Sequence, residues 1–116
     1  MELSAILKIQ KDFDSQHKIN FNWDEHITED NLLQLQFLMI ALMGEVGEMA
    51  NYIKKIVRGD MKYEQQKNHI SEELVDIFIY VIKLTYQMDI DLESEYFKKL
   101  EFNKIRFNEF NNHERF

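Results

Sequence analysis

The chain has 116 residues, which is enough for one domain with its own core and too few for two domains. Cysteine is absent, which excludes disulfide scaffolds, thiolate zinc sites and cysteine nucleophiles, and a reducing cytoplasm is the expected location. The formal net charge is -7, from 21 acidic and 14 basic residues. Because a surface that binds nucleic acids is basic, we expect no nucleic-acid partner.

Neither the N-terminus nor the longest apolar stretch has the pattern that directs a chain to a membrane. Residues Met1–Ser4 do not begin a signal peptide. The apolar stretch Leu35–Met43 is interrupted by Gln36 and followed by Glu45, so it falls short of the roughly 20 apolar residues that a bilayer requires. We therefore expect a soluble protein with no membrane partner.

An all-α domain is predicted, because proline is absent and only three glycines punctuate the chain. Apolar residues at helical spacing indicate a first amphipathic helix from Leu3 to about Lys18. The pattern then breaks over residues 19–27. A long second helix is expected from an N-cap at Thr28 to about Arg58, where Gly59 stops it after a basic last turn.

Two further helices are expected in the second half of the chain. Residues 60–68 are predicted to form a polar connection, followed by a third helix from His69 to about Met88. A fourth helix is expected from Leu92 to about Phe110, with a frayed tail over residues 111–116. Together these elements predict a single four-helix bundle-like domain that spans residues 1–116.

The second and third helices are too apolar to be covered within one chain. The second contains Leu32, Leu33, Leu35 and the run 37–43, and the third contains the run 77–82. A helix that is apolar on all sides must be buried on all sides. We therefore predict a homodimer or homotetramer whose interface uses these faces, with a monomeric bundle as the alternative.

Two acidic pairs lie inside these apolar helices, Glu45-x-x-Glu48 in the second and Glu73-x-x-Asp76 in the third. Residues three apart are neighbours on one helix face, so each pair presents two carboxylates side by side. Burying several carboxylates together is unfavourable unless cations or protons neutralise them. An antiparallel helix pair would bring all four together, which predicts a divalent-metal site.

Neighbouring residues shape this predicted site. Gly44 and Gly47 flank Glu45 within a helix, where a glycine costs about 1 kcal/mol relative to alanine, so we expect them to admit the close approach of another group. Glu72 is an alternative to Glu73 as a ligand, but Glu73 lies closer to the apolar side. The competing interpretation is that both pairs are solvated charges on amphipathic helices.

The donor atoms indicate which metal the site would take. The four histidines, His17, His26, His69 and His113, are scattered and form no H-x-x-x-H or E-x-x-H pattern. A site of carboxylates alone favours magnesium, with manganese as an alternative, over zinc or iron. A di-iron bundle is therefore disfavoured.

The combined pattern resembles a known family. The segments GEVGEMANYIKK and SEELVDIFIYVIKL, which carry the acidic pairs, are similar to the MazG-like all-α nucleoside triphosphate pyrophosphohydrolases. The segment MDIDLESEYFKKLEFNKIRF resembles that family's closing helix, with its K-x-x-x-N-x-x-R pattern. The similar motifs lie within about Leu32 to Phe107. We assign the resemblance as a whole to about residues 28–110 of the domain.

The resemblance implies a magnesium-dependent enzyme that cleaves a nucleoside triphosphate between the α- and β-phosphates and releases a monophosphate and pyrophosphate. Metal binding and catalysis would then fall to Glu45, Glu48, Glu73 and Asp76. The implied nucleotide and phosphate contacts are Lys54, Tyr80, Lys99, Asn103 and Arg106. The structural alternative is a core position for the tyrosine and solvated positions for the basic residues.

Two aromatic residues near the N-terminus, Phe21 and Trp23, are candidates for stacking on the base or for pinning a loop to the core. The expected substrate is a non-standard or deoxy nucleotide. One alternative is a phosphoribosyl-ATP pyrophosphohydrolase of histidine synthesis. Another is a non-catalytic helical oligomer that acts as a regulatory or antitoxin-like partner.

Overall fold

The structure, a computed structural model, describes residues 1–17 and 20–114, and these residues form helices without any strand. Four α-helices and one short 3-10 turn follow one another in the order α1 Leu3–Ser15, η1 Glu29–Asn31, α2 Leu32–Arg58, α3 Tyr63–Gln87 and α4 Leu92–Glu114. The predicted all-α class is confirmed.

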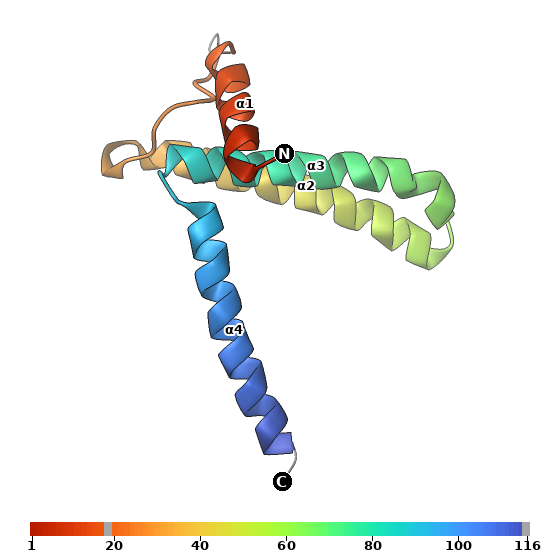
Figure 1. Ribbon diagram of the computed structural model, residues 1–116. Coiled ribbons are helices and arrows are strands. Elements are labelled where there is room, and N and C mark those ends of the chain that lie inside the picture. Colours follow the sequence, from red (N-terminus) through yellow and green to blue (C-terminus); the bar gives the residue numbers. More distant parts are fainter. Residues whose placement is uncertain (18–19, 115–116) are drawn as a thin grey trace.

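Helices α2 and α3 form a long antiparallel hairpin, the central element of the fold (Figure 1). α2 ends at Gly59, whose φ of 92° lies in the left-handed region that a residue without a Cβ adopts readily. The N–H groups of Gly59 and Asp60 donate to the carbonyls of Ile56 and Lys55 at 3.0 and 2.9 Å. These bonds satisfy the last carbonyls of α2 and let the chain reverse.

The connection within the hairpin is shorter than predicted. The sequence predicts a polar connection over residues 60–68 and a helix from His69, but α3 already begins at Tyr63. That prediction was wrong because residues 64–67 are polar without being turn formers, and Glu, Gln and Lys have high helix propensity. Glu64 also places a negative charge in the first turn, where the helix dipole favours it.

The ends of α1 and α2 also differ from prediction. α1 ends at Ser15, and its predicted end at Lys18 lies outside the described residues. Thr28 is a cap as predicted, since its hydroxyl accepts from the backbone N–H of Asp30 at 3.2 Å. It caps the short turn η1, however, so that α2 begins four residues later at Leu32.

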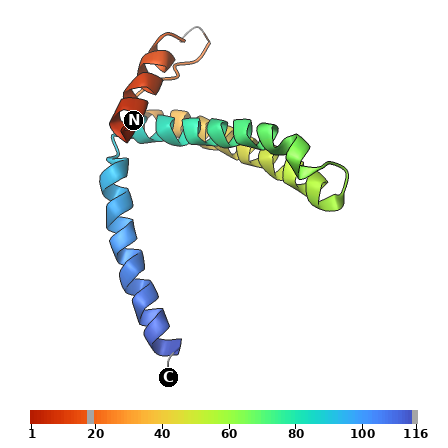
Figure 2. The same ribbon diagram turned by 45° about the vertical axis from the view of Figure 1, so that its right-hand side comes forward.

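The buried interior of one chain is small and largely polar. α1 packs against α3 near the end from which α4 departs (Figures 1 and 2). Among the described residues, the only buried large apolar side chains are Leu38 and Ile82. The other buried side chains are polar or charged, namely Asp14, Gln34, Lys83, Thr85 and Gln87. The apolar surface of the hairpin is thus mostly uncovered within one chain.

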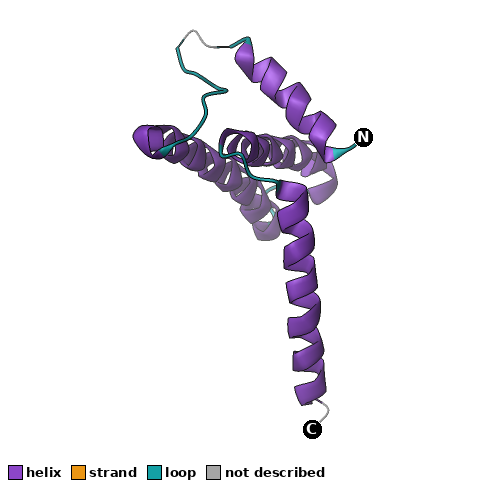
Figure 3. Cartoon of the chain, turned by 60° about the vertical axis from the view of Figure 1, so that its left-hand side comes forward, coloured by secondary structure: helices purple, strands orange, loops and turns teal. Residues whose placement is uncertain are grey.

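Helix α4 projects away from the hairpin in all three views (Figures 1, 2 and 3). It carries a set of exposed large apolar side chains, Tyr96, Phe97, Phe102, Ile105, Phe107 and Phe110. It also continues past its predicted end, so that residues 111–114 of the expected frayed tail are helical. One chain alone therefore leaves the predicted four-helix bundle open.

One stretch of the described residues, Glu29–Arg58, is long and apolar enough to cross a membrane, with a mean hydropathy of 1.3. The core helix of a soluble protein has the same length and composition. Glu45 and Glu48 lie near the middle of this stretch, where a bilayer would strongly disfavour their ionised carboxylates. These two residues favour a helix that packs on protein.

Candidate metal centre

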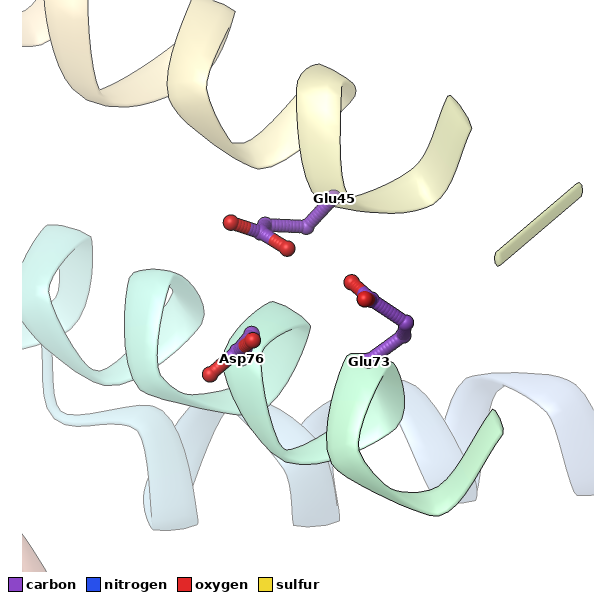
Figure 4. A group of neighbouring side chains, drawn as sticks. All are labelled: Glu45, Glu73 and Asp76. Atoms are coloured by element: carbon purple, nitrogen blue, oxygen red, sulfur yellow. The ribbon is translucent and has the colours of Figure 1, made fainter. Parts of the chain in front are cut away.

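Three carboxylates meet on the facing sides of α2 and α3. Glu45 comes from α2, and Glu73 and Asp76 come from one face of α3, with one oxygen of each residue within 4.8 Å of the others. Figure 4 shows the Glu45 side chain reaching from its helix toward the other two. All three residues are half-buried. The antiparallel hairpin thus brings members of both predicted acidic pairs together.

The fourth predicted ligand, Glu48, lies beside this group of three. It is more exposed than the others, one turn further along α2 than Glu45. Glu73 raises the pKa of Glu48, first by sharing a hydrogen bond and then by charge repulsion. The pKa of Glu73 is itself raised, first by Glu45 and then by burial. Glu48 and Glu73 therefore hold protons more tightly than isolated carboxylates do.

The group has the features of an oxygen-donor cation site. Oε2 of Glu73 is buried and has no hydrogen-bond partner among the described residues. None of the four carboxylates forms an ion pair with a basic side chain in that part of the chain. An unpaired buried carboxylate oxygen is unfavourable, and a divalent cation would satisfy it. Magnesium and manganese accept such all-oxygen ligand sets, so the residues present fit the predicted metal.

The two glycines beside Glu45 leave free space. A Cβ added at Gly44 or Gly47 would meet no atom within 4 Å. Within the described residues, no other segment uses the close approach that these glycines permit. Glu72, the alternative ligand, is exposed and lies outside the group of three. This placement supports the choice of Glu73 over Glu72.

Tyr80 lies one turn after Asp76 on α3 and is half-buried. Its pKa is raised, chiefly by burial and further by the negative charges of Glu45 and Asp76. The phenol is therefore neutral near the carboxylates and keeps an O–H that can donate a hydrogen bond. Of the predicted nucleotide contacts, this is the one that the hairpin itself brings to the acidic group.

The predicted phosphate contacts on α4 do not reach the acidic group within one chain. Lys99, Asn103 and Arg106 belong to the helix that projects away from the hairpin (Figure 1). The Lys99 ammonium lies 4.7 Å from the centre of the Phe102 ring, on α4 itself. Lys54 is exposed on α2, about 13 Å along the helix axis from Glu45 at 1.5 Å per residue. These roles remain predictions.

The two candidate base-stacking residues form an aromatic cluster with α2. The ring of Phe21 lies 4.7 Å from that of Trp23 and 4.2 Å from that of Phe37, centroid to centroid. Phe21 and Phe37 also line an open cleft of about 990 Å³ together with Leu33 and Ile40. The aromatic cluster therefore offers apolar surface near the start of α2, two turns before Glu45.

Sequence reasoning missed a buried polar network next to this aromatic cluster. Asp14 of α1 forms an ion pair with Lys83 of α3, with 3.4 Å between Oδ1 and Nζ. Nε2 of Gln34 donates to Oε1 of Gln87 at 2.9 Å, which joins α2 to α3. The available signal was weak: Lys83 interrupts an otherwise apolar run over residues 77–84. A lysine in such a run is normally expected to extend its ammonium to solvent.

One protein-family model matches most of the hairpin and part of α4. Residues 33–104 match the family model described as the MazG nucleotide pyrophosphohydrolase domain. The match includes both acidic pairs and four of the five predicted contacts, Lys54, Tyr80, Lys99 and Asn103, and it ends two residues before Arg106.

Two curated proteins are similar over part of the chain. Gene 37 protein of Mycobacterium phage L5 is 36% identical over 67 residues, which are 56% of this chain and 59% of that protein. dCTP pyrophosphatase 1 of Homo sapiens is 30% identical over 74 residues, 60% of this chain and 44% of that protein. The chain thus spans less than two thirds of the length of either relative, and no solved structure gives a significant match. Because the family model covers more than half of the chain and contains both acidic pairs, the chain belongs to the MazG nucleotide pyrophosphohydrolase domain family.

Proposed function

We propose that the protein is a magnesium-dependent nucleoside triphosphate pyrophosphohydrolase, with manganese as a possible substitute. The reaction would cleave the bond between the α- and β-phosphates and release a nucleoside monophosphate and pyrophosphate. The observation that carries the proposal is the group of three carboxylates from facing helices, in which one buried oxygen of Glu73 lacks a hydrogen-bond partner. Membership of the MazG family supports the reaction class.

The carboxylates would divide two tasks between them. Glu45, Glu73 and Asp76 would hold the cation, since their oxygens lie within one coordination sphere's reach of each other. When bound, the cation supplies charge neutralisation for the phosphates and a more acidic water. Glu48 lies at the exposed edge of the group, one turn from Glu45, where its carboxylate could accept a proton from water. We assign it the orientation or deprotonation of the attacking water.

The aromatic residues would bind the nucleoside. Tyr80 would donate a hydrogen bond from its neutral phenol beside the carboxylates. Trp23 and Phe21 would offer ring surface to the base, at the end of the hairpin where the cleft along α2 opens. Binding the base and the phosphates at separate places would hold the α-phosphate near the cation.

The phosphate clamp is proposed to come from a second copy of the chain. Lys99, Asn103 and Arg106 lie on a helix that projects from its own hairpin, and both that helix and α2 expose many apolar side chains. Burying those side chains against another copy would be strongly favourable, which supports a homodimer or homotetramer. In such an assembly, Lys99 and Arg106 would stabilise the departing pyrophosphate.

The similarity to a dCTP pyrophosphatase supports a deoxynucleoside triphosphate as substrate, in line with removal of non-canonical or deoxy nucleotides. A cytoplasmic location and the absence of nucleic-acid and membrane partners are part of the same proposal. They are supported by the lack of cysteine and by the acidic net charge of -7.

The test is to incubate the protein with magnesium and a panel of canonical and modified triphosphates and to identify both products. We expect a monophosphate and pyrophosphate, with turnover abolished by a chelator and restored by added magnesium. A diphosphate and orthophosphate would mean that the terminal phosphate is attacked, and the clamp assigned to α4 would be withdrawn. No turnover on any nucleotide, phosphoribosyl-ATP included, would favour the non-catalytic oligomer.

A further inference from the structure

A lysine on α3, Lys83, is buried with its charge between two aromatic rings. Only 9% of its side chain is exposed, and its ammonium nitrogen lies 4.1 Å from the ring centre of Trp23 and 5.3 Å from that of Tyr80. A cation within about 6 Å of a ring centre is attracted to the ring face. The same ammonium thus contacts the residue proposed to stack on the base and the residue beside the carboxylates.

The position of Lys83 is set by Asp14, whose side chain is 1% exposed. The Asp14 carboxylate forms the ion pair with Lys83 and also accepts hydrogen bonds from Gln10 and from the phenol of Tyr86. A carboxylate with three partners has little freedom to move. The lysine is therefore anchored from α1, although it belongs to α3.

The loop that carries Trp23 is held by the same network. The backbone carbonyl of Trp23 accepts a hydrogen bond from Nε2 of Gln87 at 2.6 Å. This bond holds the backbone of Trp23 and Lys83 lies over its ring, so the residue is held at both its backbone and its side chain.

The buried pair offers little stability by itself. Taking two charges out of water is unfavourable, and apolar residues of similar size at both positions are often equally stable or more stable. A second role for the pair is therefore worth testing. The rings that Lys83 contacts belong to the two ends of the proposed nucleotide site, so the role to test is the positioning of these rings.

We propose that Lys83, anchored by Asp14, is a positioning residue that fixes the rings of Trp23 and Tyr80 for the nucleotide. The inference rests on the proposed function and adds to it a residue outside the acidic group. Lys83 does not touch the reacting phosphates in this arrangement. It acts through two side chains that contact the bound substrate in its ground state, so its loss should affect binding more than the chemical step.

The test replaces the buried pair without leaving one charge unpaired. In Asp14→Asn/Lys83→Met both charges are removed and the side-chain volumes are nearly kept, so we expect a folded protein. On the best triphosphate of the panel, KM should rise by roughly tenfold, while kcat stays within about threefold of the wild type. Lys83→Arg keeps a cation over the rings, so its KM should stay closer to that of the wild type than to that of the double variant.

Trp23 supplies a readout that stability alone would not change, because it is the single tryptophan of the chain. Titration with α,β-methylene-dCTP and magnesium should alter its fluorescence in the wild type, with the midpoint shifted to higher concentration in the double variant. The matched control is Arg58→Met/Asp60→Asn, which removes an exposed ion pair at the far end of the hairpin. Its KM and its fluorescence titration should equal those of the wild type.

The outcomes separate this inference from the proposed function. A folded double variant with wild-type KM and an unshifted titration would overturn the role of Lys83 while leaving the enzyme assignment intact. A wild-type protein that neither hydrolyses any triphosphate nor responds to the analogue would overturn both. If the double variant does not fold, Asp14→Asn/Lys83→Gln retains polar groups at both positions and is judged by the same measurements.

Discussion

The α2–α3 hairpin and helix α4 differ in whether their predicted site residues meet within one chain. The hairpin assembles its three carboxylates from its own two arms. α4 has comparable length and also carries predicted site residues, but it projects from the hairpin with its apolar side chains exposed. Under the proposed function, the metal centre would therefore require only the fold of one chain, whereas the phosphate contacts on α4 would require a second copy.

The largest effect should follow from removing a carboxylate in the hairpin. Glu45→Gln or Asp76→Asn should lower kcat/KM by at least about a thousandfold, because each variant deletes a charged ligand of the cation. The metal-free fold should be as stable as the wild type or more so, since like-charge repulsion is relieved. Steady-state kinetics and thermal melting in a chelator measure the two effects.

Glu72→Gln is the matched control for these variants. Glu72 neighbours Glu73 in sequence but lies outside the group of three, so its activity should be unchanged. Full activity in Glu45→Gln, or a comparable loss in Glu72→Gln, would contradict the assignment of the metal centre.

A smaller effect should follow from changing the basic residues of α4. Arg106→Gln should lower kcat by roughly 10² to 10³, the range for losing one donor to developing charge. If α4 serves the site of another copy, mixing Arg106→Gln with Glu45→Gln should restore measurable activity, because mixed assemblies contain one site with neither defect.

Two observations would contradict the assignment of α4 to the site of a second copy. Sedimentation that shows a well-folded monomer at low micromolar concentration would argue against an obligate assembly. Equal and additive defects with no recovery on mixing, under conditions where the two variants exchange subunits, would place α4 at the site of its own chain.

The smallest expected effect is a dependence of the stability of the metal-free hairpin on pH. Crowding raises the folded-state pKa of Glu48 and Glu73 above the ordinary value of 4.5. Between the unfolded and folded pKa values the folded state holds more protons, so stability falls as pH rises through that window. In a chelator, the melting temperature of the wild type should therefore decrease from pH 4.5 upward, until the raised pKa values are passed.

Glu73→Gln should flatten this dependence, because it removes the residue at the centre of the crowding. Glu72→Gln should retain the wild-type slope. An identical slope in Glu73→Gln and the wild type would show that other groups cause the pH dependence.

The sequence predicted the helical class and the acidic pairs because both depend on local spacing. Glu45 and Glu73 were expected to face each other, and the hairpin brings them together. The predicted start of α3 was wrong because residues 64–67 are as polar as a loop. Their high helix propensity determined the structure instead.

The remaining features depend on contacts that no local pattern encodes. Asp14 and Lys83 are 69 positions apart, and their pairing exists only because α1 crosses α3. The direction of α4 could not be predicted either. An apolar helix face indicates that it packs against another surface, but it does not indicate which one. Local periodicity therefore predicted which carboxylates meet across the hairpin better than it predicted their surroundings.

The tight reversal at Gly59 has a consequence for how the chain tolerates insertions and deletions. Glu45 lies 14 positions before Gly59 and Glu73 lies 14 positions after it, so the turn sets the register of the two ligands. One residue added to either arm between the turn and the ligands would rotate a ligand by about 100° and move it by about 1.5 Å. The length of chain on either side of the reversal thus determines whether the three carboxylates meet, as much as the carboxylates themselves do.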